Sequence, residues 1–296
     1  MASAVADTQP PRRILLATDL GSHCDRALDR AAQLAVQWQA TLHVVHALQP
    51  ETAGFWWPPP EDEHYPGDHD VAAVERQIRR DLRDEVADVV IHVAAGEPAQ
   101  VILDTAARER CELIVLGAAG PTSAGVALSS TASQLMRKSP ASLLVVKARP
   151  HQDYRKVLVG SDFTAESRYG LEAATGWFPD AAFALMHALD IPYKSLLLDA
   201  GREHEFSRME RDTMESFISG AQLCADIRPR IQTHIEYGHP EIMLRRHVMA
   251  NDIDLTVIGA LTRGLAFHVL VGGNATRIAQ TVPSDILMVR AIADRR

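Results

Sequence analysis

The chain has 296 residues, enough for two domains of ordinary size, and 47% of them are hydrophobic, as in globular proteins with buried cores. A net charge of −8 without long runs of lysine or arginine argues against nucleic acid as a partner. The sequence contains neither an apolar stretch long enough to span a membrane nor the features of a signal peptide. Because the three cysteines are widely spaced, we expect a reducing compartment and a cytoplasmic protein.

Five short blocks occur twice in the same order, 141 to 143 residues apart. The first copies are Arg13–Asp19, Leu42–Leu48, His92–Ile102, Leu113–Gly120 and Pro140–Ala148. The second copies are Lys156–Asp162, Phe183–Leu189, His234–Leu244, Leu255–Thr262 and Pro283–Ala291. A repeat this long indicates two tandem domains. We expect a flexible tail at residues 1–11, a first domain at 12–149, a linker at 150–155 and a second domain at 156–296.

Each repeat alternates short, continuous apolar runs with longer amphipathic segments. The runs are typical of strands that are buried on both faces. Within Cys24–Ala40, apolar residues such as Ala27, Ala31 and Leu34 recur at helical spacing. The alternation predicts an α/β fold made of two tandem Rossmann-like, three-layer domains. Each would hold about five mostly parallel strands and four helices, with ligands at the carboxyl ends of the strands.

Both repeats share an ordered set of features. An Asp closes the first strand, His-Ala-Leu closes the second, Gly-x-Pro opens the third helix, and an apolar strand with a glycine leads into a loop. This set resembles the universal stress protein family over nearly the whole chain. The resemblance implies an adenine-nucleotide α-hydrolase-like fold and a pairing of the two repeats through their last strands, as in a dimer fused into one chain. It further implies that ATP binding depends on a G-x2-G-x9-G-[ST] motif, which some members have and others lack.

Neither repeat carries the complete motif. In the first repeat Gly117 and Gly120 match, Ser129 stands at the third glycine, and Ser130 takes the hydroxyl position after a loop of eight residues. Keeping nine residues instead puts Ser130 on the glycine and Thr131 on the hydroxyl. Glycine in such a loop lets backbone N–H groups approach phosphate oxygens and permits positive φ. The first repeat therefore keeps its hydroxyls but has no cation in the loop.

The second repeat matches the motif at two of its three glycines, and its candidate residues are Gly259, Thr262, Arg263, Gly272, Gly273 and Asn274. Thr262 replaces the second glycine and, being β-branched, suits a left-handed turn poorly. Gly273 takes the hydroxyl position and offers no side chain. Arg263 can pair with a phosphate in compensation, and Asn274 can replace the missing hydroxyl.

The resemblance also implies roles for two residues at strand ends in each repeat. Asp19 and Asp162 would lie near the ribose or a phosphate-bound metal, and the backbones of Ala47 and Ala188 would meet the adenine edge. For the two aspartates, capping of the following helix is an equally good explanation, because Asp at a strand end often caps a helix. Both explanations stay open at this point.

The sequence offers no clear catalytic group. His46 and His187 are expected to be buried, hydrogen-bonded core residues, and Cys24 is expected to be an inert thiol. No nucleophile elbow, Walker loop or kinase signature occurs, so an enzyme ranks last among the hypotheses and slow ATP hydrolysis is the most we expect. The segment Phe55–Asp70 contains acids and histidines without the spacing of metal ligands, so we interpret it as a surface loop and predict no metal site.

We therefore expect a stress-response protein that binds ATP or ADP, with or without Mg²⁺, in at least one repeat as a regulatory ligand. The alternative is a pseudo-dimeric scaffold or interaction protein whose nucleotide sites have decayed. The sequence leaves both a monomer and a homodimer of tandem chains open.

Overall fold

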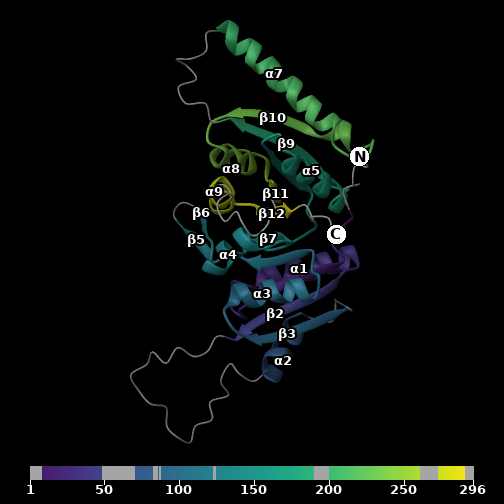
Figure 1. Cartoon of the computed structure of the whole chain (residues 1–296), viewed down its shortest axis with the longest axis vertical. Coiled ribbons are helices and arrows are strands. Elements are labelled where there is room, and N and C mark those ends of the chain that lie inside the picture. The colour runs from purple at the N-terminus through teal and green to yellow at the C-terminus, as the bar shows by residue number, and fades with distance from the viewer. Residues whose placement is uncertain are drawn as a thin grey trace, which may run out of the picture.

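The structure is a computed structural model that describes residues 9–48, 71–82, 86, 88–122, 125–189, 200–260 and 273–290. Its two halves follow one another along the long axis of the molecule, with α2 towards one end and α7 towards the other (Figure 1). None of the described helices is long and apolar enough to cross a membrane.

The first half contains five parallel strands in the order β3-β2-β1-β4-β7. These strands are β1 (Arg13–Thr18), β2 (Thr41–Leu48), β3 (Val89–Ala95), β4 (Leu113–Gly117) and β7 (Ser142–Val146). Its helices are α1 (Asp25–Trp38), α2 (Val71–Asp81), α3 (Pro98–Arg108) and α4 (Ser130–Lys138). A small antiparallel hairpin of β5 (Gly120–Thr122) and β6 (Gly125–Ala127) lies between β4 and α4.

The second half repeats this arrangement in the order β10-β9-β8-β11-β12, again with parallel strands. The strands are β8 (Lys156–Ser161), β9 (Ala182–Leu189), β10 (Gln232–Tyr237), β11 (Leu255–Ala260) and β12 (Asp285–Arg290). The helices are α5 (Ala165–Trp177), α7 (Ala200–Ser219), α8 (Pro240–Asn251) and α9 (Gly273–Thr281), and a short 3₁₀ helix, η2, covers Arg228–Arg230. The predicted five-stranded α/β domains are thus confirmed.

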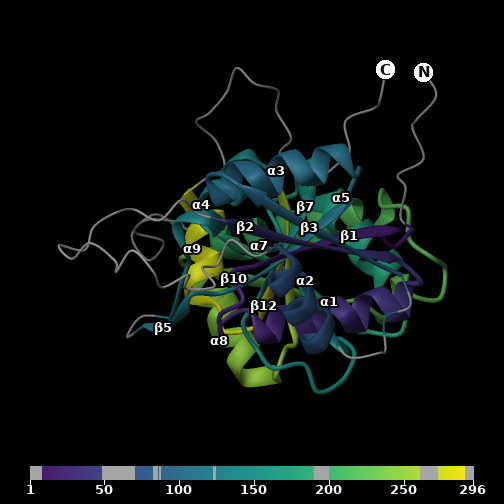
Figure 2. The ribbon, with the colours of Figure 1, turned by 90° about the horizontal axis from the view of Figure 1, so that it is seen from below.

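Helices cover both faces of the sheet and bury a hydrophobic core on each. Helices α1, α2, α5 and α7 contribute to one core, and α3, α4, α8 and α9 contribute to the other. Successive strand residues alternate between them, so Leu15 belongs to one core and Leu16 to the other. Figure 2 shows α3 on one side of the first-half sheet and α1 and α2 on the other. This double coverage explains the continuous apolar runs.

The two halves join edge to edge through their last strands. β7 and β12 pair antiparallel, which makes one ten-stranded sheet of the two five-stranded ones. Trp38 at the end of α1 packs against Trp177 and donates a hydrogen bond from Nε1 to its carbonyl oxygen at 3.2 Å. The pairing of the repeats through their last strands, implied by the resemblance, is therefore present within the chain.

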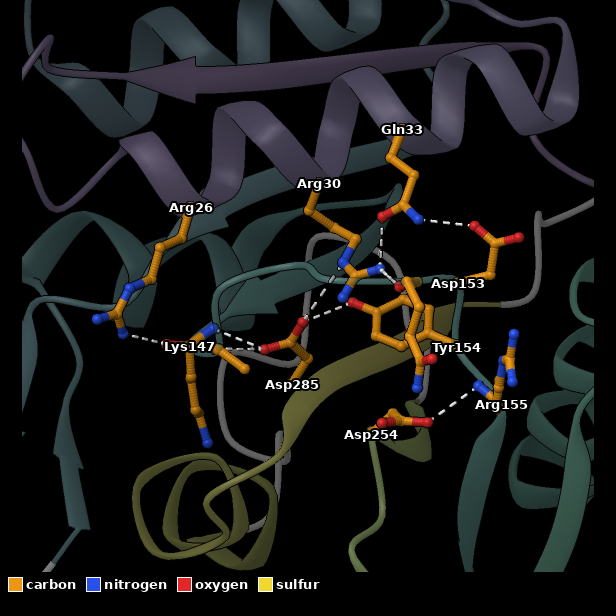
Figure 3. A network of polar contacts seen from close by, with 11 residues as sticks. Arg26, Arg30, Gln33, Lys147, Asp153, Tyr154, Arg155, Asp254 and Asp285 are labelled. Atoms are coloured by element: carbon orange, nitrogen blue, oxygen red, sulfur yellow. Dashed lines mark hydrogen bonds and ion pairs between the residues drawn. The ribbon is translucent and has the colours of Figure 1, made fainter.

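A buried polar network lies beside this junction (Figure 3). Asp285 is 0% exposed, and its carboxylate accepts hydrogen bonds from the backbone of Lys147 at 2.7 Å and from the Tyr154 hydroxyl at 2.6 Å. The Nε atom of Arg30 lies 3.8 Å from the same carboxylate, and the Arg30 guanidinium stacks over the Tyr154 ring. A buried charge costs stability unless it is paired and hydrogen-bonded. The Asp285 carboxylate meets this requirement with groups from α1 and from the connection between the halves.

Candidate functional site

In each half the strand order reverses at one pair of neighbours, β1 with β4 and β8 with β11. The helices that follow these two strands in the first half, α1 and α4, contribute to opposite cores. Such a switch point opens a crevice at the carboxyl ends of the strands, where α/β proteins bind ligands. Asp19 follows β1 and Gly117 ends β4 at this crevice, and Asp162 and Gly259 lie at the corresponding places in the second half.

The two aspartates close tight turns. Asp19 Oδ1 accepts hydrogen bonds from the Gly21 N–H at 2.8 Å and from the Cys24 thiol at 3.0 Å. Asp162 Oδ1 accepts one from the Thr164 N–H at 3.2 Å and one from the Thr164 hydroxyl. Neither aspartate is the N-cap of the next helix, because Cys24 holds that position in α1 and Thr164 holds it in α5. Capping, one of the two explanations that the sequence left open for these aspartates, is therefore wrong, and their role in nucleotide binding stays a prediction.

The Asp19 turn fixes the charge state of both partners. Burial raises the pKa of Asp19, but the hydrogen bonds from Cys24 and Gly21 outweigh it, so the pKa lies below its usual value. Burial raises the pKa of the Cys24 thiol to about 11, and the Asp19 carboxylate beside it adds to this. At neutral pH the pair is a carboxylate and a protonated thiol, and a protonated thiol is a poor nucleophile.

A strained residue that the sequence did not predict follows each aspartate. Leu20 has φ of 63° and Phe163 has φ of 62°, in the left-handed region that bulky residues rarely adopt. The Leu20 N–H donates to the Thr18 hydroxyl at 3.0 Å, and the Phe163 N–H donates to the Ser161 hydroxyl at 3.1 Å. Backbone strain of this kind concentrates at functional sites. Positive φ also recurs at Arg110 and Asp252 after α3 and α8, but of these pairs Leu20 and Phe163 are the ones that lie at the switch points.

Gly117 and Gly259 are needed for a reason other than the predicted one. Neither has positive φ, and a Cβ on Gly117 would lie 2.5 Å from the carbonyl oxygen of His23. A Cβ on Gly259 would lie 2.2 Å from that of Glu166. β4 therefore packs directly against the backbone at the start of α1, and β11 against that at the start of α5, the helices that follow the neighbouring strands β1 and β8. Glycine here allows two chain segments to meet, and this close packing explains it without any ligand.

The loop of the first half forms the β5–β6 hairpin. Gly120 has φ of +125°, as expected for a turn glycine, and it pairs with Ala127 on the neighbouring strand of the hairpin. Ser129 is the N-cap of α4, and its Oγ accepts the Ala132 N–H at 3.0 Å. Ser130 begins the helix and is exposed, and Thr131 is half-buried. The cap uses the Ser129 oxygen as an acceptor and occupies the N–H groups of Ala132 and Ser133, so the amides of Ser130 and Thr131 and the Ser129 O–H are the donors left for an anion.

The loop of the second half lies largely outside the described residues, including Thr262, Arg263 and Gly272. Helix α9 begins at Gly273, and Asn274 follows within its first turn. Asn274 Oδ1 accepts a hydrogen bond from Arg277, whose Nε lies 3.4 Å from Glu241 Oε1. The side-chain oxygen of Asn274 is thus bound to Arg277, and its side-chain NH₂ group is the donor left to replace a hydroxyl.

The histidines next to the strand ends are core residues, as expected. His46 and His187 are each 9% exposed. His46 Nδ1 lies 3.0 Å from the carbonyl oxygen of Thr18, and His187 Nδ1 lies 2.7 Å from that of Ser161. These hydrogen bonds tie the second strand of each half to the strained turn of the first.

The predicted adenine contacts lie at the same edge of the sheet. Ala47 pairs with Ala94 and Ala188 pairs with Glu236, and both alanines are half-buried. They are one residue from the carboxyl ends of β2 and β9, beside β1 and β8. Two surface cavities in the described residues lie elsewhere, one lined by Arg12, Glu112 and Trp177 among others, and one beside His247 and Asn251.

The fold and these turns define a tandem Rossmann-like α/β protein with one reversal of the strand order in each half. The family model of the universal stress proteins matches residues 11–147 and again residues 153–290. These matches span nearly the whole chain, so the protein belongs to the universal stress protein family and carries two copies of its domain.

Solved structures agree on the fold. A functionally unknown protein from Pseudomonas aeruginosa PAO1 is similar with a TM-score of 0.68 and 22% identity, over 96% of this chain and 94% of that chain. A universal stress protein from Archaeoglobus fulgidus DSM 4304 is similar with a TM-score of 0.69 and 15% identity, over 95% and 98% of the two chains. Identities this low show a shared fold alone. No curated protein matches the chain closely enough in sequence to count as a relative.

Proposed function

We propose that this protein binds an adenine nucleotide, ATP or ADP, at the strand-end crevice of at least one half. In this role the nucleotide is a regulatory ligand rather than the substrate of an efficient reaction. The observation that carries the proposal is the strained turn repeated at the switch point of both halves, where Leu20 and Phe163 hold positive φ beside Asp19 and Asp162.

The surrounding groups suit a nucleotide. The first-turn amides of α4 can bind a phosphate, because a helix N-terminus combines free N–H groups with a partial positive charge. In the first half, Ser130 and Thr131 supply hydroxyls next to them. In the second half, Arg263, Gly273 and Asn274 are the corresponding candidates. Asp19 and Asp162 are exposed, so their carboxylates are accessible to a ribose or to a phosphate-bound Mg²⁺.

A pseudo-dimeric scaffold is the second candidate function. Two observations favour it: close backbone packing explains Gly117 and Gly259 without a ligand, and the side-chain oxygen of Asn274 already accepts a hydrogen bond from Arg277. In this alternative the ten-stranded sheet presents surfaces to a protein partner, and the crevices bind nothing.

Nucleotide binding is tested first on the purified protein. Denaturation followed by absorbance and mass spectrometry shows whether a nucleotide copurifies. Thermal and chemical unfolding with ATP, ADP or AMP and Mg²⁺ then measures binding, since a ligand at 100 times its Kd stabilises by about 2.7 kcal/mol. Stabilisation by ATP or ADP supports the proposal. If no nucleotide changes the stability, nucleotide binding is refuted and the scaffold function is favoured.

Nucleotide binding by Asp19→Asn and by Asp162→Asn shows which half of the protein binds the nucleotide. Asparagine keeps an oxygen acceptor for each turn but removes the charge, and both side chains are exposed, so the fold is spared. Variants of Gly117 or Gly259 are unsuitable, because any Cβ there collides with backbone. We expect one of the two Asn variants to weaken nucleotide binding about tenfold. Equal binding in both variants and in the double variant would contradict a site beside these aspartates.

A further inference from the structure

Three possible metal ligands meet at the opposite, amino edge of the first-half sheet. His43 lies near the start of β2, His92 lies in β3, and Glu109 directly follows α3. Their ligand atoms all lie within 4.8 Å of one another. This cluster is separate from the strand-end crevice, because α3 runs back along the sheet and ends where the strands begin.

The two histidines already face each other as a ligand pair would. His43 Nδ1 lies 3.0 Å from His92 Nε2, and the ring planes differ by only 10°. His43 is 5% exposed and is held by its strand, while His92 is half-buried on the neighbouring strand. In a tetrahedral zinc site with bonds of about 2.0 to 2.2 Å, ligand atoms lie roughly 3.3 Å apart. The imidazole pair is close to this spacing without any movement of the backbone.

Arg108 holds the place that a cation would take. Its Nε lies 2.8 Å from Glu109 Oε1, and its Nη2 lies 3.4 Å from His92 Nδ1. A guanidinium only donates hydrogen bonds, so His92 Nδ1 accepts and the His92 proton lies on Nε2, facing His43. The Arg108 side chain is 58% exposed and that of Glu109 is 27% exposed, so both can move. When Arg108 swings away, the His92 proton can shift to Nδ1 and free Nε2 as a ligand.

The second half shows that the fold does not require this cluster. Val45 pairs with His92 in the first half, and Met186 pairs with His234 in the second, so His234 is the equivalent of His92. The same register puts Ala184 in the place of His43, and Asn251 in the place of Glu109. The second half thus builds the same strands and helix with one of the three ligands.

We propose that His43, His92 and Glu109 form a binding site for a first-row divalent transition metal of the Zn²⁺ type. His43 Nδ1, His92 Nε2 and a Glu109 carboxylate oxygen are the protein ligands, and water completes the coordination. Two imidazoles and one carboxylate favour such ions over Mg²⁺ and Ca²⁺, which prefer oxygen ligands alone. Binding displaces Arg108 from both Glu109 and His92.

The test uses the full chain without an affinity tag. Zn²⁺ binding is measured by calorimetry, and Co²⁺ is added as a spectroscopic probe, since a four-coordinate Co²⁺ site absorbs strongly in the visible range. Glu109→Asn and His43→Ala introduce the residues found at the equivalent positions of the second half. We expect Glu109→Asn to weaken binding at least about tenfold and His43→Ala to abolish the Co²⁺ spectrum. Because Glu109 is partly exposed, its variant reports on binding even if His43→Ala fails to fold.

Two further variants make the test specific. Arg108→Ala removes the competing cation, so we expect it to tighten Zn²⁺ binding several-fold, an effect opposite in sign to the ligand variants. His247→Ala is the matched control, because His247 lies beside His234 in the second half without a matching carboxylate at Asn251. The proposal is overturned if Zn²⁺ binds Glu109→Asn as tightly as the unaltered chain, or if His247→Ala removes the Co²⁺ spectrum.

Discussion

Asp285 and Ser142 hold equivalent positions on β12 and β7, the two strands that join the halves. The side chain of each accepts a hydrogen bond from a backbone N–H at the far end of the opposite strand. Asp285 Oδ1 accepts from the Lys147 N–H at 2.7 Å, and Ser142 Oγ accepts from the Arg290 N–H at 3.1 Å. The two halves therefore make equivalent hydrogen bonds across the junction, but the accepting groups differ. One end of the junction holds a buried carboxylate with Arg30 and Tyr154, and the other holds a neutral hydroxyl.

Asp285→Ala should destabilise the protein by about 3–5 kcal/mol, because it leaves the buried Arg30 without its charged partner. Ser142→Ala removes one neutral hydrogen bond and should cost about 1 kcal/mol. Unfolding by urea, followed by circular dichroism and by tryptophan fluorescence, measures both. Equal losses in the two variants would show that the charge of Asp285 adds nothing to the junction.

Lys147 should make stability depend on pH above neutrality. Burial lowers its pKa from 10.5 to about 8, and its Nζ donates to the carbonyl oxygen of Val282. The charged form is therefore penalised in the folded state below pH 8, and the penalty disappears as the pH rises towards the unfolded pKa. Between pH 7 and about pH 9.5, the unaltered chain should gain about 2 kcal/mol relative to Lys147→Met.

Denaturation of the unaltered chain and of Lys147→Met at both pH values measures this gain. Lys138→Met, which removes an exposed lysine, serves as the control. A stability difference between the unaltered chain and Lys147→Met that stays constant over this range would refute the buried charge.

Gly259→Ala should destabilise the second half by about 3 kcal/mol, since its Cβ would lie 2.2 Å from a backbone oxygen and force β11 away from the start of α5. Gly160→Ala on the neighbouring strand β8 is the matched control. Its Cβ would meet Ile258 and Leu244 at 3.6 Å, an ordinary contact. A stability loss in Gly160→Ala as large as in Gly259→Ala would mean that close backbone packing is not the reason for the glycine.

Ser129→Ala should cost about 1 kcal/mol through loss of the N-cap of α4. Ser130→Ala, one residue further along and exposed, should change stability by less than about 0.5 kcal/mol. Chemical denaturation compares the two. If Ser130→Ala proves the more harmful, the helix is capped by a residue other than Ser129.

The fold was predictable because its signals are local and repeated. Ten apolar blocks in two ordered sets defined the strands, and the His-Ala-Leu blocks correctly indicated His46 and His187 as core residues. Strands and helices can be predicted from short windows of sequence, because the apolar runs and the helical spacing that indicate them extend over only a few residues.

The site was harder to predict because its determinants are backbone angles and distant contacts. The positive φ of Leu20 and Phe163 has no signature in side chains that normally avoid it. Glycine at 117 suggested a phosphate loop, whereas its role depends on His23, which reaches it only after folding. His43, His92 and Glu109 are far apart in the chain and lack any ligand spacing, so only the register of β2 with β3 brings them together.

The antiparallel junction of β7 with β12 has a consequence for signalling. β7 and β12 run in opposite directions, but the twist of the ten-stranded sheet turns the outer strands of the two halves the same way, so β2 and β10 both point to the left in Figure 1. The segments that follow β4 and β11 also meet, because β6 contacts α9. The strand ends of the two halves therefore lie on one flank of the molecule, and a change at one of them can reach the other through this direct contact as well as through the shared sheet.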